Sequence, residues 1–312
     1  MRIYIDGNSG TTGLRIHERL SAREDITLLT LPEEKRKDPA AKQEIYAASD
    51  VVFFCLPDAA AREAASLAFE VQKTHPLRII DTSTAHRTEA GWAYGFPELS
   101  DSMRRNIEQS SRTAVPGCHA SGFIALVKPL IDANLVAKDA LLTCHSLTGY
   151  SGGGKAMIAS YEANDRPRGY DSPRQYALSQ QHKHLREMVA VTGVQNAPAF
   201  CPIVGDFYSG MLVTVPLFRQ QCKGSIEDIR AVYRETYTTE LVQHQESIAD
   251  EGGFIAASAL CGKDSMRISV SGNEERILLT ALYDNLGKGA SGAAVQCLNI
   301  MTGMDETTGL VL

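Results

Sequence analysis

Two features are missing from this sequence: a long apolar run and a paired-cysteine motif. No apolar stretch reaches the roughly 18 residues that span a bilayer, and residues 1–6 read as a strand, not as the start of a signal peptide. The seven cysteines are scattered and odd in number, without a Cys-x-x-Cys pair or a Cys/His cluster. This pattern argues against a disulfide framework and against a zinc site. We therefore expect a protein of the cytoplasm, a reducing compartment, that binds no metal.

Positive charge is also scarce relative to negative charge. The 312 residues include 31 Lys and Arg against 37 Asp and Glu, which gives a net charge of −6. That balance argues against nucleic acid or an anionic membrane as the main partner. The hydrophobic (44%) and charged (22%) fractions are ordinary for a globular protein, and the chain is long enough for two domains. The composition favours a small-molecule substrate.

The most informative stretch is residues 115–122, with Cys118 at its centre. Pro116 and Gly117 break the preceding segment, and apolar residues with helical spacing follow from Phe123 onward. The pattern therefore predicts that Cys118 lies at a helix N-terminus, where unpaired N–H groups and the helix dipole favour a thiolate. A thiolate in that position is a candidate nucleophile for a carbonyl carbon. The alternative is a small buried residue in a turn.

The first eighty residues alternate between apolar strands and helical segments. We predict strands at 3–6, 26–31, 51–56 and 78–81, with an alanine-rich helix over 59–69. Such alternation indicates a parallel sheet that is covered by helices on both faces. The turn Gly7–Gly13 has the spacing G-x-x-G-x-x-G and opens the first helix. Glycines there allow a tight turn and a close approach of backbone N–H groups to a pyrophosphate.

A basic triplet, Lys35, Arg36 and Lys37, follows the second predicted strand. In NAD-specific folds an acidic side chain near this point binds the ribose 2′-hydroxyl. The basic residues suit the 2′-phosphate of NADP instead. The alternative is a solvated loop of mixed charge.

The middle of the chain contains candidates for anion binding. After a strand predicted at 140–147, residues 148–155 form a glycine-rich segment ending in Lys155. Its backbone amides and its ammonium group suit an anionic substrate, and a flexible hairpin connection is the alternative. Arg166, Arg168 and Arg174 lie in the irregular stretch that follows.

A helix predicted from Tyr176 to about Val191 contains His182, His184 and Glu187. His184 and Glu187 are three residues apart and therefore share a helix face. A carboxylate beside an imidazole raises its pKa and orients the ring. Histidines in this setting are also common as surface or core residues, and as zinc ligands these two lack a third partner.

The C-terminal third indicates an α+β domain with a mixed sheet. Strands are predicted within 208–218 and 266–283, and Ser225 opens a helix with a capping signature. Residues 284–295 form a glycine-containing loop that leads into a helix of small residues.

Taken together, the motifs resemble one family in their order along the chain. The matching segments are Gly7–Gly13, 54–57, 81–87, 94–98, 116–118, 151–155, 182–187 and 285–290. They resemble the N-acetyl-gamma-glutamyl-phosphate reductases, specifically the shorter bacterial type, over essentially the whole chain. The related aspartate-semialdehyde dehydrogenases share the glycine turn and the catalytic cysteine but match residues 116–119 and 182–187 less closely.

The resemblance implies an NADPH-dependent reductase of an acyl phosphate in arginine biosynthesis, working through a cysteine thioester as a homo-oligomer (dimer or tetramer). It implies a Rossmann-type NADP-binding domain formed by 1–117 with 285–312, and a catalytic and substrate domain formed by 118–284. Cys118 matches the nucleophile, and His182, His184 and Glu187 match the segment that supplies the acid–base group, with the choice of imidazole open. His86 and His119 stand where the family more often has aromatic residues, and Arg186 replaces a common proline.

The remaining site residues fall into two groups. Those expected to bind the cofactor are Gly7, Ser9, Gly10, Thr11, Thr12, Gly13, Lys35, Arg36, Cys55, Leu56, Pro57, Ser83, Asn285, Lys288 and Gly289. Those expected to bind the substrate are Arg87, Glu98, Ser151, Gly152, Gly153 and Lys155.

Three other functions are compatible with part of these features. An aspartate-semialdehyde dehydrogenase-like enzyme would use the same chemistry on a shorter acyl phosphate. A cysteine hydrolase would use Cys118 and His184 without a nucleotide, and the glycine turn argues against it. A non-catalytic NADP-binding regulator would have no use for Cys118 together with a base.

Overall fold

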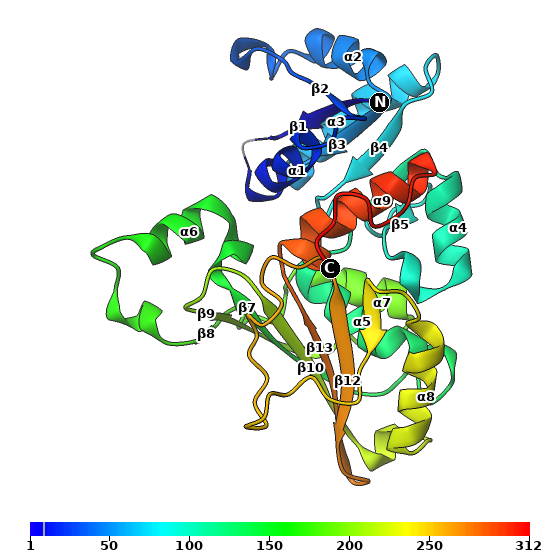
Figure 1. Ribbon diagram of the computed structural model, residues 1–312, viewed down its shortest axis with the longest axis vertical. Coiled ribbons are helices and arrows are strands. Elements are labelled where there is room, and N and C mark those ends of the chain that lie inside the picture. The colour runs from blue at the N-terminus through cyan, green and yellow to red at the C-terminus, as the bar shows by residue number, and fades with distance from the viewer. Residues whose placement is uncertain (9) are drawn as a thin grey trace. The chain divides into compact units, whose positions relative to one another are not determined.

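The computed structural model describes residues 1–8 and 10–312 (Figure 1). Ser9, one of the expected cofactor contacts, lies outside the described residues. The chain forms two compact units. The first comprises Met1–Pro97, Ser102–Pro116 and Ala290–Leu310, and the second comprises Glu98–Asp101, Gly117–Gly289 and Val311–Leu312.

The first unit contains a six-stranded parallel sheet in the order β2-β1-β3-β4-β6-β5. Its strands are β1 (Arg2–Asp6), β2 (Thr27–Leu29), β3 (Val51–Phe54), β4 (Arg78–Asp81), β5 (Ala93–Tyr94) and β6 (Arg112–Ala114). The helices are α1 (Thr11–Ser21), α2 (Pro39–Ala48), α3 (Asp58–Gln72), α4 (Asp101–Gln109) and α9 (Gly292–Thr302). The order confirms the predicted Rossmann-type sheet, and it reverses between β1 and β3, where such sheets bind their ligands.

Two apolar layers cover the sheet of the first unit. Side chains alternate along each strand, so that Ile3, Ile5 and Phe53 pack with α1 and α9 on one face. Tyr4 and Phe54 pack with α2 and α3 on the other. This double covering explains why the strands read as continuous apolar runs in the sequence.

The second unit contains a seven-stranded mixed sheet in the order β11-β12-β13-β10-β7-β9-β8. The strands are β7 (Thr143–Gly149), β8 (Arg174–Gln175), β9 (Ala199–Gly205), β10 (Met211–Phe218), β11 (Val242–His244), β12 (Met266–Gly272) and β13 (Arg276–Tyr283). The helices are α5 (Cys118–Asp132), α6 (Gly154–Glu162), α7 (His184–Thr192) and α8 (Ile226–Thr236). Helix α5 packs on β10 and β13, and α7 and α8 pack against α5 (Figure 1). The predicted mixed sheet is confirmed.

The prediction that a helix begins at Tyr176 is wrong, because α7 begins only at His184. Ala177 and Gln180 have positive φ angles of 52° and 57°, which a right-handed helix does not allow. The side-chain amide of Gln180 instead donates to the carbonyl oxygen of Phe200 and accepts from its N–H. This pairing with β9 holds the segment in a non-helical path, so His182 lies before the helix.

Several predicted boundaries also change. The strands predicted at 26–31 and 51–56 are shorter, at Thr27–Leu29 and Val51–Phe54, whereas the strand predicted to end at 147 continues to Gly149. Thr148 and Gly149 remain in the sheet because they pair with Val204 and Gly205 of β9. The segment expected as a glycine loop is a 3-10 turn, Tyr150–Gly153, that leads into α6, with Lys155 inside the helix. Within the described residues, no helix is both long and apolar enough to cross a membrane.

The predicted cap of α8 is present and gives a stability test. The Ser225 hydroxyl accepts from the Asp228 N–H, and the Asp228 carboxylate accepts from the Ser225 N–H. We expect Ser225→Ala to lower the free energy of unfolding by about 1 kcal/mol, measured by urea unfolding followed by circular dichroism. Ser160→Ala, in exposed helix α6, is the control. An unchanged midpoint in Ser225→Ala would contradict the capping role.

Candidate active site

Cys118 is the first residue of α5, as predicted, and Gly117 is the N-cap in an extended conformation. The side chain of Cys118 is half-buried. The first N–H groups of a helix lack intrahelical partners, and together with the dipole they favour negative charge at this end. The thiol therefore lies where a thiolate, or an oxyanion formed on an acyl group attached to it, is stabilised.

Tyr283 fixes the first turn of this helix. Its hydroxyl donates to the carbonyl oxygen of Cys118 at 2.6 Å and accepts from the N–H of Gly122 at 3.0 Å. In a regular α-helix these two backbone groups bond directly to each other. Gly122 is required at this point, since a Cβ there would lie 2.6 Å from Val213 and 2.7 Å from the Tyr283 oxygen.

Glu187 and His184 lie on the first turn of α7, which packs against α5. Both side chains are buried, and a carboxylate oxygen of Glu187 accepts from the Gly117 N–H at 2.8 Å. The carboxylate thus holds the residue before Cys118. The imidazole of His182 stands 4.7 Å from that of His184, and its Nδ1 accepts from the His184 N–H. Both candidate imidazoles therefore belong to one cluster.

The turn between β13 and α9 brings further predicted residues into the second unit. The amide of Asn285 donates to the Ser151 hydroxyl at 3.0 Å and accepts from the Gly210 N–H at 2.8 Å. A Cβ on Gly289 would lie 3.1 Å from the Cβ of Cys118, so the turn passes directly against Cys118. Lys288 donates to Glu98 at 2.6 Å, and both side chains are almost fully buried.

The other expected substrate contacts are spread more widely. Gly152, Gly153 and Lys155 are exposed on the 3-10 turn and the start of α6. Arg87, in the first unit, donates to the carbonyl oxygens of Val115 and Thr82. Arg87 therefore supports the backbone of the first unit through two carbonyl groups.

Two arginines of the irregular stretch support the local structure near α6. Arg166 pairs with Asp206 and Asp171, and Arg174 stacks on the ring of Tyr170. These contacts occupy both guanidinium groups.

In the first unit, the glycine turn lies at the point where the strand order reverses. Gly7 has a φ of 91°, and a Cβ there would lie 2.3 Å from the carbonyl oxygen of Cys55. On Gly13 a Cβ would lie 2.4 Å from the carbonyl oxygen of Gly7. The Thr11 hydroxyl is buried and has no hydrogen-bond partner among the described residues. A tight backbone turn with an unsatisfied hydroxyl at the start of α1 fits the phosphates of a dinucleotide.

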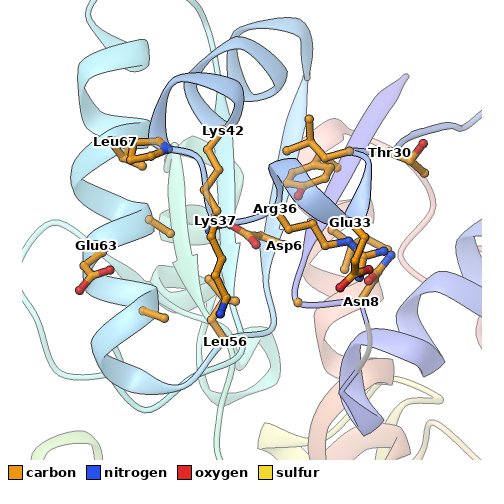
Figure 2. Close-up of a pocket in the computed structure, with 17 residues that line it drawn as sticks. Asp6, Asn8, Thr30, Glu33, Arg36, Lys37, Lys42, Leu56, Glu63 and Leu67 are labelled. Carbon is orange, nitrogen blue, oxygen red and sulfur yellow. Dashed lines mark hydrogen bonds and ion pairs between the residues drawn. The ribbon is translucent and has the colours of Figure 1, made fainter.

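A pocket of about 530 Å³ adjoins this turn (Figure 2). Its wall includes Asn8, Leu56, Arg36 and Lys37, but not Lys35. Figure 2 shows Arg36 beside Glu33, with which it forms an ion pair at 2.6 Å. The pocket is thus lined by two of the three basic residues that follow the second strand.

Asp6 brings a buried negative charge to the same pocket. Its carboxylate accepts from the Lys42 ammonium at 2.7 Å and from the Tyr46 hydroxyl at 2.6 Å. Lys42 offsets this charge, which would otherwise repel a phosphate group.

The remaining expected cofactor residues follow strands β3 and β4. Cys55 and Leu56 follow β3, and Pro57 is the N-cap of α3. Ser83 donates to Asp81, whose carboxylate also binds the His86 ring at 2.6 Å. His86 stacks on Trp92.

Sequence reasoning missed two residues that the structure brings into these sites: Tyr283 and Lys42. Tyr283 carries a weak signal, because it is a polar-tipped residue at the end of an apolar strand directly before the turn 284–289. Lys42 has no signal of that kind. In the described part of the chain, no three or more His, Cys, Asp or Glu side chains are arranged to hold a metal ion.

Comparison with known proteins gives matches over nearly the whole chain. Residues 118–285 match the family model of the semialdehyde dehydrogenase dimerisation domain, and residues 32–109 match that of the semialdehyde dehydrogenase NAD binding domain. The N-acetyl-gamma-glutamyl-phosphate reductase of Burkholderia ambifaria is 41% identical, covering 97% of this chain and 96% of its own. The N-acetyl-gamma-glutamyl-phosphate reductase of Brucella ovis is 42% identical, and the match covers 97% of this chain and 99% of the relative.

Solved structures agree on the fold. The aspartate semialdehyde dehydrogenase II of Vibrio cholerae has a TM-score of 0.73 at 17% identity, covering 97% of this chain and 98% of its own. The aspartate semialdehyde dehydrogenase of Candida albicans, solved with NADP, has a TM-score of 0.66 at 16% identity. The match covers 96% of this chain and 98% of that structure's chain.

The environments of two half-buried cysteines predict different reactivity. Burial, and then the nearby charges of Asp81 and Asp6, raise the pKa of Cys55 to about 12, while a hydrogen bond with Thr82 lowers it in part. Cys55 is therefore a thiol at pH 7, and it becomes a thiolate only as the pH approaches that value. We expect iodoacetamide at pH 7 to alkylate Cys118 at least about tenfold faster than Cys55, as measured by peptide mass spectrometry. Equal labelling would show that the helix start does not activate Cys118.

Proposed function

Because the chain belongs to the N-acetyl-gamma-glutamyl-phosphate reductases of the semialdehyde dehydrogenase family, we propose that it reduces N-acetyl-gamma-glutamyl phosphate in arginine biosynthesis. The products are N-acetyl-glutamate 5-semialdehyde and phosphate, and the reductant is NADPH. One observation carries this proposal: Cys118 is the first residue of α5, and α7, which carries the buried His184 and Glu187, packs against that helix.

In the first half of the reaction the Cys118 thiolate attacks the acyl carbon. A carbon–sulfur bond forms, the bond between the acyl carbon and the phosphate oxygen breaks, and phosphate leaves with the electron pair. The first N–H groups of α5 stabilise the oxyanion that develops on the acyl oxygen. His184 or His182 takes the thiol proton and passes it to the leaving phosphate.

In the second half the thioester is converted to the aldehyde. NADPH, when bound, supplies a hydride to the thioester carbon. The carbon–sulfur bond then breaks and the sulfur leaves as the thiolate, which the helix start again stabilises. Glu187 keeps Gly117, and with it the helix start, in place through both halves.

The residues of the first unit fit the cofactor. Backbone groups of Gly7–Gly13 and the Thr11 hydroxyl would hold the pyrophosphate. Arg36 and Lys37 would bind the 2′-phosphate in the adjoining pocket, since guanidinium and ammonium groups suit that group. We propose 1–117 with 285–312 as the nucleotide-binding part and 118–284 as the catalytic part. On this assignment Asn285, Lys288 and Gly289 contribute to cofactor binding.

We further propose a homo-oligomer, a dimer or a tetramer, formed through the second unit. The match of residues 118–285 to a dimerisation domain supports this assembly. A cytoplasmic location is supported by the cysteines, none of which forms a disulfide.

The alternative functions have weaker support. Likeness to aspartate semialdehyde dehydrogenases amounts to 17% identity, against 41–42% for the N-acetyl-gamma-glutamyl-phosphate reductases. A cysteine hydrolase leaves the glycine turn unexplained. A non-catalytic regulator leaves unexplained why Cys118 begins a helix that packs against His184 and Glu187 of α7.

The basic wall of the pocket predicts a preference for NADP over NAD. The double variant Arg36→Ala/Lys37→Ala should weaken NADP binding by roughly tenfold or more, because it removes the charge-assisted hydrogen bonds to the 2′-phosphate. NAD binding, which needs no such partners, should change little. Titration of cofactor fluorescence at two salt concentrations measures both effects, with Lys73→Ala as the control for an exposed charge. An equal loss for both cofactors would mean that Arg36 and Lys37 do not bind the 2′-phosphate.

The thioester predicts that the reverse reaction depends on phosphate. With N-acetyl-glutamate semialdehyde and NADP, the cofactor should be reduced steadily only when phosphate or arsenate is present to cleave the thioester. Cys118→Ser should lower turnover by about a hundredfold or more, because a serine hydroxyl has a far higher pKa. Cys201→Ser, another half-buried cysteine of the second unit, is the control. Steady reduction in phosphate-free buffer would refute the mechanism, and a preference for aspartate semialdehyde would refute only the substrate.

A further inference from the structure

The pocket beside the glycine turn of the first unit contains as many acidic as basic side chains. Its wall includes three of each kind: Asp6, Glu33 and Glu63, and Arg36, Lys37 and Lys42. Ion pairs join Asp6 to Lys42 and Glu33 to Arg36. A carboxylate therefore lies on one of the two cations that we assign to the 2′-phosphate of NADP.

The local backbone brings Glu33 and Arg36 together. Glu33 begins the 3-10 turn η1 (Glu33–Lys35) after β2, and the N–H of Arg36 donates to the carbonyl oxygen of Glu33 at 3.3 Å. Side chains three residues apart eclipse one another in a 3-10 helix. This geometry places the Glu33 carboxylate 2.6 Å from the Arg36 guanidinium (Figure 2). Glu34, on the same turn, is not among the residues that line the pocket.

The Glu33–Arg36 ion pair is weak enough to be exchanged for another anion. The Glu33 side chain is 81% exposed and that of Arg36 is 38% exposed. Water and salt screen a pair in this position. A phosphate monoester carries more negative charge than a carboxylate and accepts two parallel hydrogen bonds from a guanidinium. Exchange of Glu33 for the 2′-phosphate should therefore reduce NADP affinity by no more than about fivefold.

The same carboxylate suits NAD, which has a 2′-hydroxyl in place of the 2′-phosphate. An acidic side chain after the second strand is the group that accepts from this hydroxyl in NAD-binding folds. The ion pair uses Oε2 of Glu33, which leaves Oε1 for a hydroxyl donor. NAD can therefore bind while Glu33 and Arg36 stay paired.

We propose that Glu33 is a specificity-determining residue of the nucleotide pocket, which accepts the ribose 2′-hydroxyl of NAD and releases Arg36 to the 2′-phosphate of NADP. The pocket on this account takes both cofactors, and Glu33 limits the preference for NADP. Lys37 forms no ion pair with any described residue, so it binds the phosphate without an exchange and keeps NADP the preferred cofactor. The inference rests on the proposed function, which assigns this pocket to the nucleotide.

The test measures binding of the two oxidised cofactors to the full-length protein without substrate. Isothermal titration calorimetry gives the Kd of NADP and of NAD for the wild type and for Glu33→Gln. The substitution should lower the Kd of NADP about threefold, because Arg36 no longer has to leave a carboxylate. It should raise the Kd of NAD about threefold, because a neutral amide is a weaker acceptor than a carboxylate. The ratio of the two constants should change about tenfold.

Two matched variants separate this role from a general effect of charge. Glu34→Gln removes the same charge from the same turn, outside the pocket, and should leave both constants unchanged. Glu63→Gln removes it from the α3 side of the pocket and should change the ratio less than Glu33→Gln does. In an Arg36→Ala background, Glu33→Gln should no longer strengthen NADP binding, since the two effects act through one guanidinium.

The inference would be overturned if Glu33→Gln left the ratio unchanged, if it weakened NADP binding, or if Glu63→Gln changed the ratio equally. Opposite shifts for the two cofactors cannot come from partial unfolding, which weakens both. Failure of the wild type to bind either cofactor would overturn the proposed function together with the inference. Binding of both cofactors with an unchanged ratio in Glu33→Gln would overturn the inference alone.

Discussion

The hydroxyl of Tyr283 donates to the carbonyl oxygen of Cys118 and accepts from the N–H of Gly122, and the geometry of the start of α5 depends on these two hydrogen bonds. These two hydrogen bonds tie the first turn of α5 to β13, the strand that leads into the turn beside Cys118. Glu187 holds the preceding residue from α7. The helix start is thus fixed from two sides, which keeps the N–H groups directed at the place where negative charge forms.

Other buried polar groups around α5 also hold this helix and the turn beside it in place. Tyr233 of α8 and Tyr237, which follows that helix, donate to carbonyl oxygens of α5, and the pair Lys288–Glu98 is almost fully buried at the turn 284–289. A buried ion pair or hydroxyl is costly unless it is satisfied, so such groups specify one arrangement. These groups hold the backbone around the start of α5, which suits chemistry that needs a fixed sulfur.

The sequence predicted the features that depend on neighbours along the chain. Strand β4, the start of α5 at Cys118 and the cap of α8 at Ser225 all follow from local signals: apolar runs, a Pro-Gly break and a Ser-x-x-Asp pattern. Features that depend on distant contacts were missed or misplaced. Helix α7 starts late because Gln180 pairs with Phe200, and the contacts of Glu187 and Tyr283 with the helix start join residues 70 and 165 positions apart. No local pattern encodes such pairs, and the roles of the site residues stay predictions.

The account has one central claim, that Cys118 carries the acyl group during the reaction. The most direct measurement is intact-protein and peptide mass spectrometry after N-acetyl-gamma-glutamyl phosphate is added without NADPH. The account predicts one acyl group per chain, attached to the peptide that contains Cys118, with release of an equal amount of phosphate. Phosphate release without an acyl group on Cys118, or an acyl group on another cysteine, would contradict it.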